Sequence, residues 1–165
     1  MQSLDTRGFT INLVNCGLAK GTTSTYTTTA TTVCAINGKF ATGLTAQTNT
    51  ATPTSDAATG AAFVAQTDNT ACVYVFGVNA AGSIQVCQGG IEATEVGVTT
   101  TAGAFRNPPQ FPNLPDDFCP IGYLLVRTAP SASDFTFGTS SWTATGITAG
   151  TAINVSTLPS RPQTA

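Results

Sequence analysis

Apolar and polar residues alternate in short runs along the chain, and no 11-residue window has the spacing of an amphipathic helix. Strand-like runs occupy residues 8–14 (GFTINLV), 71–78 (ACVYVFGV), 83–88 (SIQVCQ) and 119–129 (CPIGYLLVRTA). The last run is almost continuously apolar, which is typical of a central strand buried on both faces. Short strands separated by turn residues predict an all-β protein, an antiparallel β-sandwich of jelly-roll-like type.

Turn residues predict two hairpins. Asn37-Gly38 lies between two runs of β-formers and favours a type I′ turn, because both residues tolerate positive φ. Residues 79–82 form a loop between the runs 71–78 and 83–88.

The second hairpin also predicts the surroundings of two cysteines. If Val78 pairs with Ser83, Tyr74 faces Cys87 and Cys72 lies diagonally beside it on the same face. Both cysteines are then small core residues, and diagonal neighbours are too far apart for an ideal disulfide.

The remaining segments are less regular. Residues 91–105 predict another strand, residues 134–147 a strand, turn and strand, and residues 151–159 a last strand. The Thr-rich stretch 21–32 favours an extended connector over a polar edge strand, because it contains little to bury. Residues 45–62 carry almost no large apolar group and predict a long loop on one face.

These patterns divide the chain into three parts. Residues 1–32 are predicted to form an N-terminal arm or extended segment, residues 33–160 a β-sandwich domain, and residues 161–165 a tail. A chain of 165 residues is long enough to bury a core of its own.

Charged residues are unusually scarce, and this scarcity limits the classes of function that the protein can have. Only 8% of the residues are charged, against a usual ~25%, and the net charge is -2. Nucleic-acid binding and electrostatic membrane attachment both need clustered Lys and Arg, so we expect neither partner. Mean hydropathy is +0.14, too high for a disordered chain. These values favour a polar, uncharged surface that is partly covered by partners.

Five cysteines, Cys16, Cys34, Cys72, Cys87 and Cys119, occur in a chain with no histidine and no C-x-x-C motif. The start of the chain has no visible secretory signal, and no apolar run reaches the ~18 residues of a membrane span. An odd cysteine count without a signal predicts reduced, buried thiols in a chain that folds in a cytosol. A Cys72–Cys87 disulfide is the alternative.

Candidate chemistry is sparse. The lack of histidine removes the Ser-His-Asp and Cys-His sites and the usual zinc ligand sets. Asp116-Asp117, the only adjacent carboxylate pair, predicts a turn more readily than a metal or acid–base site, because consecutive side chains of an extended chain point apart. Glu92 and Glu95 predict a solvated face or a contact to Arg106 or Arg127.

Two further groups of residues are candidate sites. Cys119 has no cationic neighbour in sequence to lower its pKa, so we expect a buried, unreactive thiol. The large aromatic residues Trp142, Tyr123, Tyr74 and Tyr26 could form a sugar-stacking platform, but core or interface positions are the more common role of such residues. We therefore predict no catalytic, cofactor-binding or metal-binding residues.

The order of motifs in the C-terminal half resembles that of a group of small virion proteins. A hairpin ending in QGG is followed by FPNLPDDFCPIGYLLV, then DFTFGTSSWTATGITAG, then a strand ending in STLPSRP. This succession, over roughly residues 70–160, resembles the head decoration, cement or head-fibre proteins of tailed bacteriophages. In that group an "lP.lPdg..pIGyl.V" element precedes an "F..GT..w.a.Gvt" element and a strand closing in LP. The N-terminal third matches only in INGKF, and five cysteines are unusual for the group.

The resemblance implies a virion structural protein on the capsid surface, folded in the host cytoplasm before assembly. It implies binding to the major capsid protein across subunit junctions, as a homotrimer or other homo-oligomer, without catalytic residues or cofactors. We expect the arm 1–32 or the loop 45–62 to reach a neighbour. The alternative is a receptor- or glycan-binding fibre or adhesin module. A hydrolytic enzyme would require Asp116 or Asp117 to lie near Glu92 or Glu95.

Overall fold

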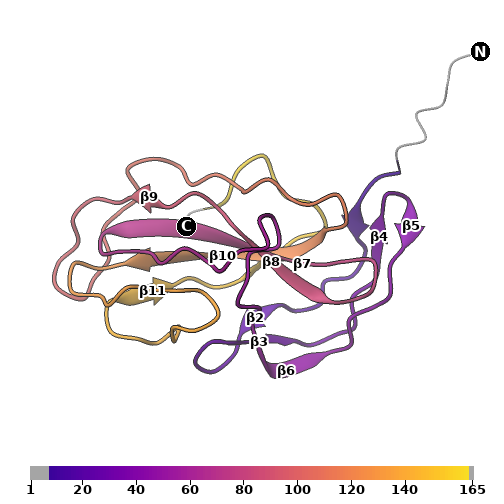
Figure 1. Cartoon of the computed structure of the whole chain (residues 1–165), viewed down its shortest axis with the longest axis horizontal. Coiled ribbons are helices and arrows are strands. Elements are labelled where there is room, and N and C mark those ends of the chain that lie inside the picture. Colours follow the sequence, from indigo (N-terminus) through magenta and orange to yellow (C-terminus); the bar gives the residue numbers. More distant parts are fainter. Residues whose placement is uncertain (1–7, 164–165) are drawn as a thin grey trace, which may run out of the picture.

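The computed structural model describes residues 8–163, and this part of the chain folds into three antiparallel sheets without a helix. The all-β prediction is therefore confirmed, and the packing of the sheets is consistent with a β-sandwich (Figure 1). The strands are β1 (Ile11–Asn12), β2 (Ala19–Lys20), β3 (Thr25–Thr28), β4 (Cys34–Ile36), β5 (Lys39–Phe40), β6 (Gln47–Ala51), β7 (Thr70–Val78), β8 (Ile84–Gln88), β9 (Glu92–Ala93), β10 (Cys119–Thr128), β11 (Ile147–Ala149) and β12 (Ile153–Asn154).

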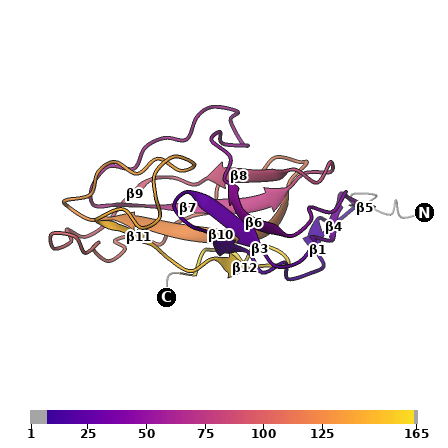
Figure 2. The same ribbon diagram turned by 90° about the horizontal axis from the view of Figure 1, so that it is seen from below.

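The main sheet has the order β11-β10-β7-β8, and its two long strands β7 and β10 are those that the apolar runs predict. β12 adds to β10 beyond β11, and β9 adds to the start of β7. Figures 1 and 2 show β7, β8 and β10 through the middle of an elongated molecule, with β4 and β5 at the end that carries the N-terminus. Long strands buried on both faces organise the rest of the fold.

One face of the main sheet packs on the two smaller sheets. A bulge between Pro120 and Gly122 sets which residues of β10 point to this side. Tyr74 stacks on Phe137 with ring centroids 4.5 Å apart, and Phe137 meets Trp142 edge-on at 5.4 Å. This aromatic cluster is the larger of the two cores.

The other face is covered by irregular chain rather than by a sheet. Val73, Val75 and Tyr123 point to this side. The proline-rich crossing, residues 105–118, lies over them, and Phe111 meets Tyr123 edge-on at 5.0 Å. The C-terminal segment, residues 155–163, closes the layer, with Leu158 packed against the same core. Prolines suit such a cover, because they lack the N–H groups that a strand would have to pair.

The segment 1–32 does not form an extended arm over the part that the structure describes. Residues 8–32 contribute β1, β2 and β3, and Tyr26 of β3 is fully buried beside Phe76, with ring centroids 6.3 Å apart. β3 is the middle strand of the β2-β3-β6 sheet rather than a connector. The prediction failed because one tyrosine anchors a strand of otherwise small residues. Residues 1–7 lie outside the described part.

The segment 45–62 is also not one long loop. Its first part forms β6, which pairs with β3 through Thr25↔Ala51 and Tyr26↔Thr50. The remainder runs along the outer edge of β8, where Ala57 donates its N–H to Val86 O at 2.8 Å. This loop therefore covers a sheet edge that would otherwise be open.

The first predicted hairpin is confirmed. Ile36 pairs with Lys39 across the turn, and Asn37 and Gly38 have φ values of 50° and 74°. Both central residues are left-handed, as a type I′ turn requires.

The second hairpin forms, but its predicted register is wrong by one residue. Val78 pairs with Ile84, and Val75 rather than Tyr74 faces Cys87. The cause is the loop: Asn79 donates its N–H to Ser83 O at 3.1 Å and accepts Ser83 N–H on Oδ1 at 2.9 Å, so Ser83 closes the loop.

The shift separates the two cysteines, because a one-residue slip exchanges the faces of a strand. Cys72 lies in the larger core and Cys87 in the smaller one, on opposite faces of the sheet. All five cysteines are free and buried, which confirms the expected reduced state and excludes the Cys72–Cys87 disulfide in this fold.

Three segments contain less strand than the sequence predicts. Segment 91–105 forms only β9 and single bridges, and segment 151–159 forms only β12. Segment 134–147 is mostly turns, since Gly138 has a φ of 82° and the N–H groups of Thr139 and Ser140 both return to Thr136 O. Its aromatic residues are held by core packing and not by a strand ladder.

Candidate functional sites

Asp116 and Asp117 form a turn, as the proline-rich sequence predicts. Asp117 accepts the N–H of Ala80 on Oδ1 at 2.8 Å, and the backbone oxygen of Asp116 accepts from Asn37 Nδ2 at 3.3 Å. The carboxylate that bonds a backbone amide in this turn is therefore that of Asp117. The turn thus ties together the β4–β5 turn, the β7–β8 loop and the start of β10.

The two carboxylate groups that a hydrolase would need are far apart. Glu92 lies opposite Ala71 at the start of β7, whereas Asp117 contacts Ala80 beyond the end of β7. A strand rises about 3.3 Å per residue, so these positions are separated by roughly 25–30 Å. Paired carboxylates of glycoside hydrolases lie within about 10 Å of each other. The pairing considered from the sequence is therefore not formed.

Glu92 and Glu95 are not joined to the arginines that the sequence suggested as partners. Arg127 donates from Nη1 to Gly103 O at 3.0 Å and lies over the ring of Phe105, 5.3 Å from its centroid. Within residues 8–163 neither glutamate forms an ion pair with Arg106 or Arg127. Glu92 is half-buried and Glu95 exposed, so the solvated-face interpretation fits Glu95 better.

All five thiols are shielded from solvent, and the pKa is raised for four of them, whereas the hydrogen bond with Cys119 lowers the pKa of Cys34. Burial raises the pKa of Cys72 and that of Cys87 to about 12. The hydrogen bond with Cys34, together with burial, raises the pKa of Cys119. Because the thiolate is the reactive form, the four cysteines with a raised pKa are poorly suited to nucleophilic chemistry, and Cys34 is kept from solvent by burial (1% exposed).

The aromatic residues that might have formed a sugar-stacking platform are in the core. Tyr26, Tyr74 and Tyr123 are fully buried. Trp142 is 4% exposed, and its Nε1 donates to Thr25 O at 2.9 Å. The core interpretation of these residues is confirmed, and a sugar platform made of them is excluded in this fold.

Two other kinds of site are absent from residues 8–163. No group of three or more His, Cys, Asp or Glu side chains there is placed to hold a metal ion. No described helix could span a membrane.

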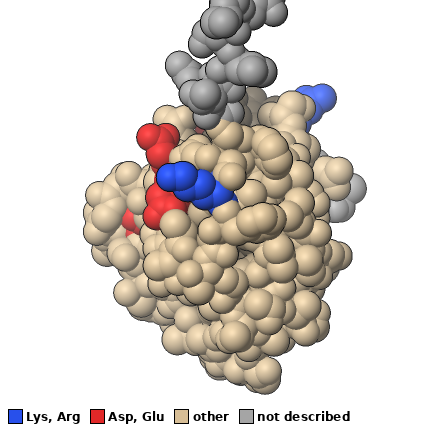
Figure 3. Space-filling model, turned by 90° about the vertical axis from the view of Figure 1, so that its right-hand side faces the viewer, with Lys and Arg blue, Asp and Glu red and all other residues tan. Residues whose placement is uncertain are grey.

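The sequence-based reasoning missed an apolar surface on the β1-β4-β5 sheet. Asn12, Cys34 and Ile36 point into the core, so the alternate positions lie on the other side of the sheet, where Ala35 is buried. The residues on this outer side with large exposed apolar groups are Phe9 (70% exposed), Leu13 (51%), Val33 (38%) and Phe40 (79%). We call these four residues the apolar outer face. Figure 3 looks onto this end of the molecule, where charged side chains gather in a small region and most of the surface is uncharged.

The register of the paired strands explains why the four residues of the apolar outer face lie on the same side of the sheet. Leu13 donates its N–H to Val33 O at 2.8 Å, next to the Asn12↔Cys34 pair, and Phe40 pairs with Ala35. The alternation of GFTINLV could have revealed the apolar outer face, because Phe9, Ile11 and Leu13 are spaced two apart around buried Asn12.

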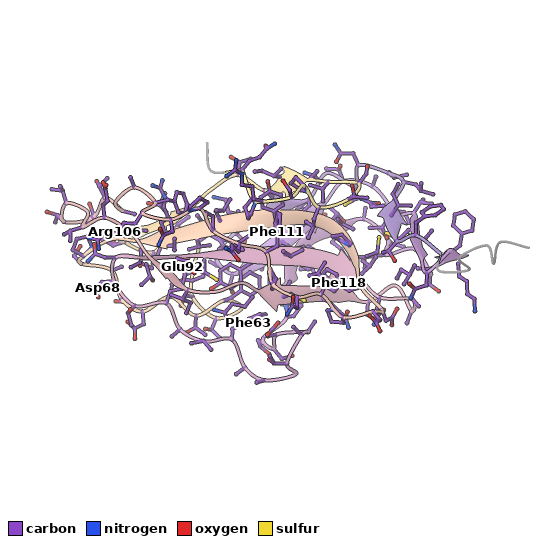
Figure 4. The ribbon with its side chains drawn as sticks, turned by 90° about the horizontal axis from the view of Figure 1, so that it is seen from above. Phe63, Asp68, Glu92, Arg106, Phe111 and Phe118 are labelled. Carbon is purple, nitrogen blue, oxygen red and sulfur yellow. The ribbon has the colours of Figure 1, made fainter. Side chains whose placement is uncertain are left out.

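A second surface feature is a groove between the proline-rich crossing and the C-terminal segment. Its volume is about 610 Å³, and it is lined by Glu92, Asn107, Pro108, Pro109, Gln110, Phe111, Ser160 and Arg161. An adjoining hollow of about 350 Å³ shares Arg161 and adds Arg106. Figure 4 shows Glu92, Arg106 and Phe111 on the same side of the main sheet.

Several of the few cations of the chain lie at the groove or at the hollows near it. The sequence has six Lys and Arg residues, of which Arg7 lies outside the described part. Three of the other five, Arg106, Arg127 and Arg161, line the groove or the hollows near it. Their positions, 21 and 34 residues apart, gave no sequence signal that they would meet.

No family model, curated protein or solved structure matches the chain.

Proposed function

We propose that this protein is a virion structural protein that decorates and stabilises a capsid by binding across junctions between capsid subunits. The observation that carries the proposal is the apolar outer face, which leaves Phe40 of β5 and Phe9, just before β1, more than two-thirds exposed. Clustered exposed apolar groups are typical of a surface that a partner covers. The scarcity of charge and the motif order of residues 70–160 support the same function.

In this proposal the partner is the major capsid protein, and the apolar outer face lies against it. Burying a phenylalanine side chain contributes about 1.5–3 kcal/mol, which is enough to change affinity by tenfold or more. The contact is formed by residues 9–40 of the folded domain, rather than by a separate arm 1–32 or the loop 45–62, which the sequence suggested. By the resemblance, the chain acts as a homotrimer or other homo-oligomer.

The test is particle association of Phe40→Ser and Phe9→Ser variants, measured by co-sedimentation with isolated heads. We expect each variant to bind at least about tenfold more weakly, with unchanged thermal stability because both side chains are exposed. Val98→Ser is the matched control, since Val98 is equally exposed (76%) but lies outside the apolar outer face. Wild-type chain that fails to associate with heads, or variants that bind as well as wild type, would contradict the proposal.

Light scattering on the purified chain, with its copy number per head, tests the oligomeric state. A homotrimer predicts a mass of three 16.7 kDa chains and head-bound copies in multiples of three. A free monomer that binds in variable number would contradict the trimer.

A further inference from the structure

The groove between the proline-rich crossing and the C-terminal segment has the size and rigidity of a ligand site. Its volume of about 610 Å³ falls within the range of small-molecule and cofactor sites, roughly 300–1,000 Å³. Pro109 on one wall and Pro162 beside the other are buried, which fixes the backbone of both walls. Gln163 donates its N–H to Tyr123 Oη at 2.9 Å and so ties the second wall to the main sheet. A preformed groove loses little entropy when it binds.

Two guanidinium groups supply the positive charge at the groove. Arg161 lines it directly, and Arg106 lines the adjoining hollow that shares Arg161. Both side chains are exposed, and neither forms an ion pair within residues 8–163. A guanidinium presents a planar fork of N–H donors that matches a carboxylate in a bidentate contact. These two residues therefore fit a ligand that carries carboxylate groups.

The other polar groups require hydrogen-bond donors on the ligand as well. Glu92 is half-buried at the start of the sheet and can only accept hydrogen bonds when it is ionised. Asn107 and Gln110 add amide groups that both donate and accept. A ligand with hydroxyl groups satisfies this set, because its hydroxyls can donate to Glu92, whereas a chain of ionised phosphates offers Glu92 no donor.

A peptide fits the same groove poorly. Protein segments are usually anchored by an apolar or aromatic side chain in a desolvated pocket. The aromatic side chain in the groove, Phe111, is half-buried and already meets Tyr123 edge-on. Pro108 and Pro109 offer no N–H groups to pair with an extended backbone. The walls thus provide contacts for carboxylates and hydroxyls but no pocket for an apolar anchor.

We propose that this groove binds an oligosaccharide that carries carboxylate groups. Arg106 and Arg161 contact the carboxylates, while Glu92 and the two amides contact ring hydroxyls. The site uses none of the buried aromatic residues, and it lies on a different part of the molecule from the apolar outer face. It therefore does not depend on capsid binding.

The test uses isothermal titration calorimetry of the full chain with trigalacturonate. We expect binding that weakens at least about tenfold for the fully methyl-esterified trisaccharide and for Arg161→Gln, because charge-assisted hydrogen bonds are lost in both cases. Arg106→Gln and Glu92→Gln should each weaken binding several-fold. Lys39→Gln is the matched control, since it removes the same charge from the exposed β4–β5 hairpin and should leave affinity unchanged.

Three results would overturn the proposal. They are no heat of binding at millimolar trigalacturonate, equal affinity of wild type and Arg161→Gln, or equal affinity for triglutamate, which carries carboxylates without ring hydroxyls. The last result would make the groove a site for acidic peptides. Unchanged thermal melting of the Arg161→Gln variant shows that a loss of binding does not arise from misfolding.

Discussion

Single side chains decide where weakly patterned segments of this protein go. Tyr26 is the one large apolar residue in a Thr-rich run, and its burial beside Phe76 places β3 inside a sheet. Asn79 acts in a comparable way, because its backbone and side chain both bond Ser83 and thereby shift the β7–β8 register. In both places the contacts of one residue decide the local structure, against the secondary-structure propensities of the residues around it.

Cys72 should make the stability of the fold depend on alkaline pH. Its pKa is raised to about 12 in the fold, from an ordinary value of 9.0. Below pH 9 both the folded and unfolded states keep the proton, so stability is unaffected. Between pH 9 and 12 the unfolded state loses the proton first, so the free energy of unfolding falls by up to about 1.4 kcal/mol per pH unit.

The measurement is urea unfolding at several pH values for wild type and Cys72→Ser. The serine retains a donor for Gly89 O, which Cys72 Sγ contacts at 3.3 Å, but does not titrate in this range. The variant should show a shallower decline between pH 9 and 11. Identical slopes would mean that the Cys72 thiol does not remain protonated in the folded state.

At the scale of elements, local sequence patterns were sufficient to predict a tight turn and the long apolar strands. The Asn37-Gly38 turn and the long strands β7 and β10 follow from turn chemistry and apolar runs alone. The pairing of β3 with β6 joins residues 19 to 26 positions apart, and neither strand has an alternation strong enough to predict it. The two candidate surfaces were missed for the same reason, since each is assembled from segments distant in the chain.

The turn at Asp117 should stabilise the junction of three elements. Asp117→Ala removes the acceptor of the Ala80 N–H, and we expect the free energy of unfolding to fall by about 1 kcal/mol. Asp116→Ala is the matched control, because Asp116 takes part through its backbone oxygen, and it should change stability by less than about 0.5 kcal/mol. Equal effects of the two substitutions in denaturant unfolding would contradict this role for the Asp117 carboxylate.

At the scale of the whole molecule, the main sheet separates two unlike surfaces. One side packs on the small sheets, and the outermost of these, β1-β4-β5, ends in the apolar outer face. The other side is covered by proline-rich and C-terminal chain, and the arginine-lined groove lies in that cover. An apolar contact and a polar groove respond differently to salt, so the two proposals can be separated on the same protein.

Binding to heads through the apolar outer face should be nearly independent of ionic strength. Only 8% of the chain is charged, and Phe9, Leu13, Val33 and Phe40 have no charge to be screened. Raising salt from about 0.05 to 0.5 M shortens the Debye length to a few ångströms, which weakens exposed ion pairs but not apolar burial. Co-sedimentation across this range should give a constant bound fraction, whereas trigalacturonate binding should weaken several-fold. Heads that release the protein as salt rises would instead indicate a contact dominated by charge and would contradict the apolar contact.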